Sequence, residues 1–267
     1  MKHFLSFFCW AYVLTLHAQP SSFAAGQGAS AGQVGVAAAN AFSAHNNPAA
    51  MSKAESFAIG LNASKPYLLD DLQAIQLSAH AQTAVGTIGL AMHSIGDRNY
   101  SERSIGLAVA RPLSETIQVG LRMDYIHLTA ALAGNESLFL PELGVTAQLS
   151  EAMTLGVKAQ NILAQDLDHP FEGQFPAWTA IGLDYQPTER FWLGAQADLL
   201  ANDALSVGLG TSYRGAKRFH FLVGARTRPA LFTGGIRIHF SRFQTQVGST
   251  YHQQLGASPH VVAQFHR

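Results

Sequence analysis

Hydrophobic alternation with a period of two is the feature that most constrains the fold of this chain. In "IQVGLRMDYIHL", Ile117 and Leu121 lie on one face, while Gln118 and Arg122 lie on the other. The stretches "RSIGLAVARPL" and "LSVGLGTSYR" repeat this pattern, with large apolar residues on one side and glycine, small or charged residues on the other. Such alternation is typical of β-strands.

About fourteen segments carry this pattern, and most are longer than the ~5–6 residues of an ordinary globular strand. Their length matches the ~9–11 tilted residues that cross the apolar core of a bilayer. The expected strands are 56–64, 72–82, 84–94, 101–111, 116–127, 138–149, 153–161, 177–186, 190–200, 204–214, 218–227, 231–241, 243–251 and 259–267.

The links between these segments alternate in length. Links after even-numbered strands are tight, as in "PLSE", "SEA", "PTE" and "RGAK". Links after odd-numbered strands are longer, as in "GDRNYSE", "TAALAGNES" and "ILAQDLDHPFEGQFP". Bacterial outer-membrane barrels have short periplasmic turns and longer outer loops. We therefore predict an all-β fold, a transmembrane antiparallel barrel of about fourteen strands in the cell outer membrane, with both termini periplasmic.

A soluble, secreted β-sandwich is the alternative fold, and its apolar face would have to be buried. The composition favours the barrel: charged residues make up 13% of the chain, hydrophobic residues 48%, and the formal net charge is zero. The expected partner is thus the lipid of the outer membrane. Nucleic acid is not expected, because it requires a basic surface.

The first residues have the form of a secretory signal peptide. Lys2 and His3 precede an apolar run from Phe4 to Leu16, and Ala18 supplies a small residue for cleavage. The run is shorter than the ~20 residues of a membrane-spanning helix. We expect a signal peptide at 1–18, an N-terminal hatch or plug segment at 19–55, and the barrel at 56–267.

If the apolar faces meet lipid, the opposite faces line the lumen, where charges are tolerated. Two interpretations of these charges stay open: a structural network that rigidifies the barrel, and a lined path for a polar or amphipathic solute. The residues expected to face the lumen are His80, Arg122, Asp124, Glu142, Lys158, Asp184, Asp198, Arg214, Arg226, Arg237 and His239.

Aromatic residues near the expected strand ends suggest the aromatic girdles of membrane barrels. They are Tyr67, Tyr100, Trp178, Tyr185, Phe191, Trp192, Phe219 and Phe243.

Motifs of enzymatic chemistry are not found. The 12 histidines form no HExxH pattern, the single cysteine, Cys9, lies in the expected signal peptide, and no GxSxG elbow occurs. We therefore expect no catalytic residues, no metal and no cofactor.

The segment before the first strand is rich in small residues and poor in charge, which is unusual for a solvated linker. Its turn, Asn46-Asn47-Pro48, leads into Ala49. The stretch "GQGASAGQVGVAAANAFSAHNNPAAMS" resembles the N-terminal signature of PorV/PorQ-type outer-membrane proteins and of the related FadL-type long-chain fatty acid transporters. The shared step is Asn-Pro-Ala, but Ala50 replaces the usual glycine, and the acidic residues common in the middle are missing.

The end of the chain, "FQTQVGSTYHQQLGASPHVVAQFHR", also resembles the closing hairpin of that family. The resemblance implies a 14-stranded barrel whose N-terminal segment folds into the lumen as a hatch, with Asn46, Asn47, Pro48 and Ala49 as its motif.

The resemblance implies two functions. The PorV/PorQ branch serves the type IX secretion system, so the main expectation is a non-enzymatic component of protein secretion whose partners are a translocon subunit or secreted cargo. The brief outer loops count against a role in gripping cargo. The alternative is a FadL-like channel for small hydrophobic molecules, which predicts an apolar pocket near the outer mouth and a kink or gap in the wall.

Overall fold

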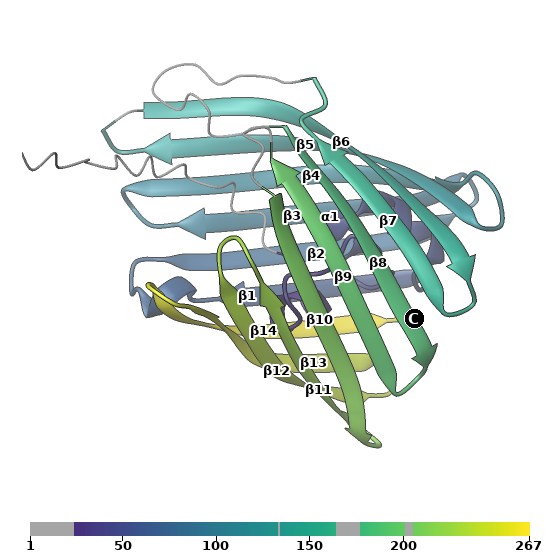
Figure 1. The fold of residues 1–267 in the computed structure, drawn as a ribbon. Helices are drawn as coiled ribbons and strands as arrows, with labels where there is room; N and C mark the ends of the chain where they lie inside the picture. Colours follow the sequence, from purple (N-terminus) through teal and green to yellow (C-terminus); the bar gives the residue numbers. More distant parts are fainter. Residues whose placement is uncertain (1–23, 133, 164–176, 201–204) are drawn as a thin grey trace, which may run out of the picture.

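The protein is a closed antiparallel β-barrel, which confirms the predicted fold class (Figure 1). The computed structural model describes residues 24–132, 134–163, 177–200 and 205–267. The expected signal peptide lies outside these residues, as does most of the long link after residue 163. The strands are β1 (Phe57–Ser64), β2 (Gln73–Thr83), β3 (Gly86–Gly96), β4 (Tyr100–Pro112), β5 (Ile117–Ala130), β6 (Gly134–Ser150), β7 (Met153–Gln160), β8 (Trp178–Thr188), β9 (Phe191–Leu200), β10 (Leu205–Ala216), β11 (Phe219–Arg226), β12 (Leu231–Phe240), β13 (Phe243–His252) and β14 (Gly256–His266).

Each strand pairs with its neighbours in the sequence, and the ring closes between β1 and β14. Closure pairs the first strand with the last, so the ring has no open terminal strand, which is what a sheet in a bilayer requires. The large apolar side chains point outward, and Leu107, Leu209 and Val247 are 69%, 55% and 60% exposed. The inward faces carry glycine, polar and charged residues, as the alternation predicts.

The two ends of the barrel differ. We call one the turn end, where the tight links 84–85, 113–116, 151–152, 189–190, 217–218 and 241–242 lie. The opposite end, the loop end, carries the links 65–72, 97–99, 131–133, 227–230 and 253–255, with the links after β7 and β9. A short 3₁₀ helix, η3 (Pro66–Leu68), lies in the first of these links.

Two of the expected long loops are instead short. Only residues 97–99 separate β3 from β4, and only residues 131–133 separate β5 from β6. These links are short because β4, β5 and β6 continue past the apolar band, the belt of outward-facing large apolar side chains. Tyr100 pairs with Ala130, and Ala130 pairs with Gly134. Ladder hydrogen bonds hold polar residues in a strand as well as apolar ones, so the polar sequence here did not mark a loop.

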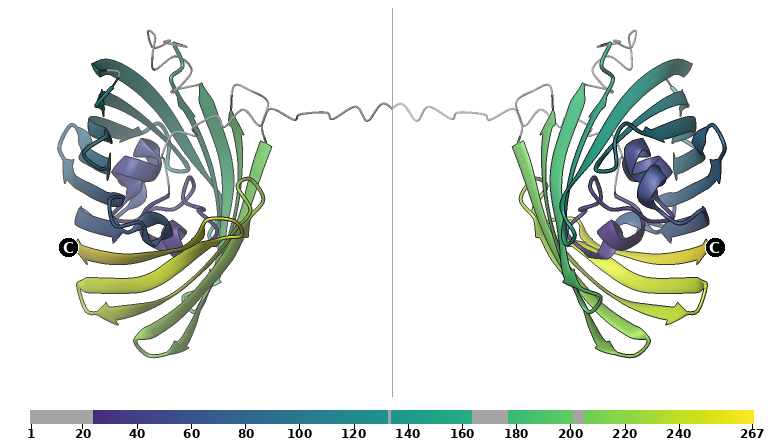
Figure 2. Two further views of the ribbon diagram at one scale, coloured as in Figure 1. Left: turned by 90° about the vertical axis from the view of Figure 1, so that its left-hand side faces the viewer. Right: turned by 90° about the vertical axis from the view of Figure 1, so that its right-hand side faces the viewer.

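Residues 24–54, here called the inner segment, lie inside the barrel (Figure 2). The segment contains η1 (Gly26–Ser30), the one-turn helix α1 (Ser43–Asn46) and η2 (Pro48–Lys53). Most of its residues are buried, including Phe42 and Met51. Its small residues allow its backbone to run close to the wall.

Inward glycines of the wall provide the matching space. A Cβ atom at Gly120 would overlap the backbone of Pro48 and Ala49, and one at Gly224 would overlap the backbone of Gly32. Glycine in a strand often marks such a close approach of another backbone. The glycines on the polar faces of the strands therefore make room for the inner segment.

Candidate functional site

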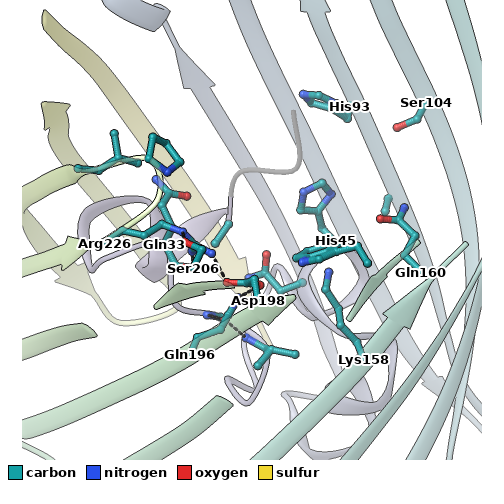
Figure 3. Close-up of a pocket in the computed structure, with 18 of the residues that line it drawn as sticks. Gln33, His45, His93, Ser104, Lys158, Gln160, Gln196, Asp198, Ser206 and Arg226 are labelled. Atoms are coloured by element: carbon teal, nitrogen blue, oxygen red, sulfur yellow. Dashed lines mark hydrogen bonds and ion pairs between the residues drawn. The ribbon is translucent and has the colours of Figure 1, made fainter. Parts of the chain in front are cut away.

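A cavity of about 420 Å³ lies inside the barrel, between the inner segment and the loop end (Figure 3). The inner segment contributes Gln33, His45 and Asn46 to its lining, and the loop end contributes Tyr67 and Leu255. The rest of the lining comes from inward side chains of strands on several sides of the barrel.

The first charged group of the lining comes from β5, β6 and β7. The Arg122 Nε donates to Asp124 Oδ2 at 2.8 Å, and its Nη2 donates to Glu142 Oε2 at 3.0 Å. The Lys158 ammonium lies 3.4 Å from the same Glu142 oxygen. All four side chains are buried. Buried charges are retained only when paired in this way, so the group is a mutually compensating unit.

Arg122 also holds the inner segment. Its Nη1 donates to the carbonyl oxygens of Ala44 and His45, each at 2.7 Å. These carbonyls belong to α1, so the guanidinium links two wall carboxylates to the inner helix. The planar fork of arginine can serve such a set of acceptors at once.

The second charged group lies on β9, β10 and β11, one strand beyond the first, since Ala180 of β8 pairs with both Lys158 and Asp198. The Arg226 guanidinium forms an ion pair with Asp198 and donates to the Ser206 hydroxyl. Gln196 donates to Asp198 through Nε2, and its Oε1 accepts from the backbone N–H groups of Gly35 and Val36. Figure 3 shows Lys158, Asp198 and Arg226 converging on the cavity from different sides.

These groups act both as a structural network and as a lining. Arg122, Asp124, Lys158, Asp198 and Arg226 all line the cavity. Arg122 pairs with Asp124, Arg226 with Asp198, and Lys158 with Glu142. The floor of the cavity is thus polar, but its charges are already compensated.

The side wall of the cavity is more apolar toward the loop end. Ile126, Trp178 and Leu231 face it, and Lys158 lies 4.2 Å from the centre of the Trp178 ring, a cation–π contact. Next to Ile126, an apolar cluster on the inner faces of β5 and β6 adds Leu128, Leu138 and Leu140.

Three of the aromatics expected in the girdle face inward instead. Trp178 lines the cavity, Trp192 is 7% exposed and packs on Val34, and Tyr67 lies at the cavity rim. The position of each of these residues in its strand or link directs its side chain into the barrel. Burial raises the pKa of the Tyr67 phenol, so this group stays neutral and able to donate a hydrogen bond.

The remaining residues expected in the lumen lie on inward faces nearer the turn end. His80 approaches the Glu55 carbonyl oxygen at 3.1 Å, and Asp184 lies on β8. Arg214, Arg237 and His239 gather on β10 and β12. The cavity does not include any of these five.

The Asn46–Ala49 motif is packed within the inner segment. Asn46 exchanges two hydrogen bonds with the backbone of Ala25, both at 3.2 Å. Asn47 caps η2, since its Oδ1 accepts from Ala49 N–H, while its Nδ2 donates to Val36 O at 2.7 Å. Pro48 opens η2, where its missing N–H costs nothing.

Several lining residues were not among those expected. His93 Nδ1 lies 3.8 Å from Glu102 Oε1, and the His93 ring is 6.3 Å from the His45 ring. The alternation could have found His93, because Met92 beside it is apolar and faces outward. The position of His45 could not be found in this way, because the inner segment has no strand pattern.

The wall is not equally paired along its length. The β6–β7 ladder ends at the pair Glu142–Gln160, although β6 begins at Gly134. Asn161 still donates its N–H to the Pro141 carbonyl oxygen at 3.0 Å and has a φ of 54°. Among the described residues, the loop-end half of β6 therefore has no ladder partner on its β7 side. Pro141, which has no N–H to donate, lies at this boundary.

Within the described ranges, no cluster of three or more His, Cys, Asp or Glu side chains is arranged to hold a metal ion. Within the same ranges, no helix has the length and apolar character needed to cross a membrane.

Comparisons with known proteins identify the fold. No family model and no curated protein matches the sequence. Solved structures do match: the CymD monoaromatic hydrocarbon channel has a TM-score of 0.64 at 14% identity, over 90% of this chain and 97% of that one. The Ralstonia pickettii toluene transporter TbuX has a TM-score of 0.64 at 12% identity, over 94% and 98%. A Pseudomonas aeruginosa FadL homologue has a TM-score of 0.62 at 11% identity, over 90% and 97%.

The barrel has the fold of FadL-type outer-membrane channels. The FadL side of the expected resemblance is thus matched in structure, while its PorV/PorQ side finds no support among the family models.

Proposed function

We propose that this protein is an outer-membrane channel for small hydrophobic molecules. The cavity between the loop end and the inner segment is the observation that carries this proposal. Its volume of about 420 Å³ lies within the ~300–1,000 Å³ range of small-molecule sites. A cavity of roughly 150 Å³ already holds benzene, so a monoaromatic molecule would fit with room to spare. The similar structures described as a toluene transporter and a monoaromatic hydrocarbon channel support this size class.

The lining favours a solute with an apolar body and a polar edge. Ile126, Trp178 and Leu231 offer apolar contact, whereas the floor presents compensated charges and polar groups. Tyr67 at the rim adds a neutral hydroxyl. A purely apolar solute would gain from the side wall but would leave the polar floor poorly solvated, which is costly.

The inner segment would act as the hatch of this channel. It lies below the cavity and is tied to the wall by Arg122, Gln196 and Arg226. In this arrangement the loop end faces outward, and the turn end, with the short links, faces the periplasm. The solute would collect in the cavity and then pass the inner segment or leave through the wall beside β6, where the ladder with β7 ends at Glu142 in the described part of the chain.

Binding can be tested through Trp178. The chain has three tryptophans, at positions 10, 178 and 192, and Trp10 lies in the expected signal peptide. In a Trp192→Phe variant of the processed protein, Trp178 is therefore the reporter. Titration with toluene or a cresol is expected to change its fluorescence to saturation. A linear response without saturation, equal to that of free tryptophan, would refute the proposed site.

Uptake can be tested in a Gram-negative host that lacks its own hydrocarbon channels. Ile126→Trp fills the cavity and is expected to reduce uptake of labelled toluene at least tenfold. Ile181→Trp is the matched control, because Ile181 faces outward and is 49% exposed. Equal uptake by the two variants would contradict the cavity as the entry site.

Type IX secretion stays a prediction from the sequence resemblance. Purification of the tagged protein from outer membranes in mild detergent distinguishes the two functions. Recovery of a translocon subunit or secreted cargo would favour secretion, and recovery of the barrel with bound apolar molecules would favour uptake.

A further inference from the structure

Three cationic or titratable side chains form a row on the inner face of the barrel near the turn end. Arg214 on β10 is the direct cross-strand partner of His220 on β11, and His220 is the partner of Arg237 on β12. The row thus has one arginine on each side of a histidine, which is ordinarily neutral near pH 7. Its net charge is positive, so a negatively charged ligand would offset it.

Arg237 has no carboxylate partner among the described residues. The residue is 7% exposed, yet its guanidinium donates only to amide oxygens: Nε and Nη2 to Gln246 Oε1 at 3.2 and 3.1 Å, and Nη1 to Gln27 Oε1 at 3.0 Å. The charged groups around the cavity are compensated by carboxylates, so this arginine differs from them. Two of its five N–H groups remain for another acceptor.

His239 adds a second, independent indication. Its ring lies over His220, with centroids 4.4 Å apart. Its Nε2 atom is buried and has no hydrogen-bond partner among the described residues. A buried polar atom without a partner costs free energy, and a bound ligand would remove that cost.

Acidic residues near the row do not neutralise it. Glu189 pairs with Arg214 at 3.0 Å, but its side chain is 89% exposed, so this surface pair contributes little. Asp184 lies on β8, separated from β10 by β9, whose Trp192 side chain faces inward. The inner rim at His220 and Arg214 is only partly buried, which gives a small ligand access from the turn end.

We propose that Arg214, His220, Arg237 and His239 form a binding site for an oxyanion, a carboxylate or a phosphate, at the turn-end mouth of the lumen. The site lies on the opposite side of the inner segment from the cavity and does not depend on the hydrocarbon proposal. Arginine's free N–H groups would hold the anion by charge-assisted hydrogen bonds, and the two imidazoles would donate from beside it. The anion would supply the negative charge that the row lacks.

The test uses the full processed chain, purified in an uncharged detergent. Sodium phosphate, sodium acetate and a short-chain phosphatidylglycerol are titrated at constant ionic strength, with chloride as the reference anion. Heat of binding is measured together with the NMR shifts of the His220 and His239 rings. We expect saturable binding of at least one oxyanion, with shifts of both rings.

Two variants locate the site. Arg237→Gln and His239→Gln are each expected to weaken binding about tenfold or more, and His239→Gln, nearer the rim, remains informative if Arg237→Gln does not fold. Arg98→Gln is the matched control, because Arg98 lies at the loop end, is exposed and does not line the cavity.

Each outcome decides the proposal. Binding of inorganic phosphate or acetate supports a site for free anions, and binding of the phospholipid alone supports a site for a lipid headgroup. Chloride binding as tightly as the oxyanions, or unchanged affinity in both site variants, would overturn it.

Discussion

Arg122 shows how much a single inward residue can hold in this barrel. Its guanidinium contacts Asp124, Glu142 and two carbonyl oxygens of α1, at distances of 2.7 to 3.0 Å. Removing it would take away the ion pair that Asp124 makes with Arg122 and would leave Glu142 with Lys158 as its ion-pair partner. The loss therefore falls on two buried carboxylates as well as on the inner segment.

We expect Arg122→Met to lower the free energy of unfolding by about 3–5 kcal/mol, the usual cost of breaking a buried ion pair. Urea unfolding in detergent, followed by tryptophan fluorescence, would measure it. The control is Arg111→Met on β4, whose side chain is exposed and bonds to the Val85 carbonyl oxygen. A loss in Arg122→Met no larger than that of the control would show that water compensates the carboxylates.

At the scale of elements, period-two alternation predicted all fourteen strands, most within two residues of their observed bounds. It worked because one face of each strand meets lipid and the other does not. It failed at β6, which begins at Gly134, because outside the apolar band a strand needs no alternation.

Period-two alternation could not predict which side chains of the site pair with one another. Arg122 lies opposite Glu142 only because β5 and β6 pair in one register. Alternation assigns a face but not a register, and the inner segment, which contributes part of the cavity lining, has no periodic pattern at all.

The contact between β12 and the inner segment can be tested by substituting two neighbouring glycines, one that faces the segment and one that does not. Gly235 faces inward, where a side chain would collide with Ser30, whereas nothing but the Leu222 carbonyl oxygen comes within 4 Å of a Cβ at Gly234. Gly235→Leu should therefore lower stability by about 1–3 kcal/mol through overpacking, and Gly234→Leu should not. Thermal unfolding of both variants would decide this, and equal effects would contradict the packing seen around Ser30.

The inner segment as a whole can be removed. Deleting residues 24–50 is expected to raise the conductance of the barrel in planar bilayers and its permeability to small polar solutes. This follows if the segment closes the lumen. A deletion variant that folds, inserts and shows unchanged conductance would refute the hatch.

At the scale of the whole molecule, the apolar band fixes the depth of the barrel in the bilayer. Leu209 lies mid-strand in β10 and faces outward, and Tyr213 lies nearer the turn end on the same face. Leu209→Arg is expected to destabilise the folded, inserted barrel by about 2–4 kcal/mol, and Tyr213→Arg by about 0–1 kcal/mol, because the cost of a charge falls toward the interface. Reversible folding into lipid vesicles measures both. Equal costs would place the band elsewhere on the strands.

The seam between β1 and β14 has a consequence for assembly. Phe57 and Arg267 exchange two backbone hydrogen bonds, at 3.3 and 2.9 Å, so the first strand is completed by the last residues of the chain. The ring cannot shut until residues 256–266 have been made and delivered. The inner segment directly precedes β1, and its Phe42 packs against Ala58 of β1 and Val262 of β14 at this seam. A polypeptide that stalls before β14 would therefore present two open sheet edges and an uncovered lumen, the form most exposed to proteases and to pairing with other chains.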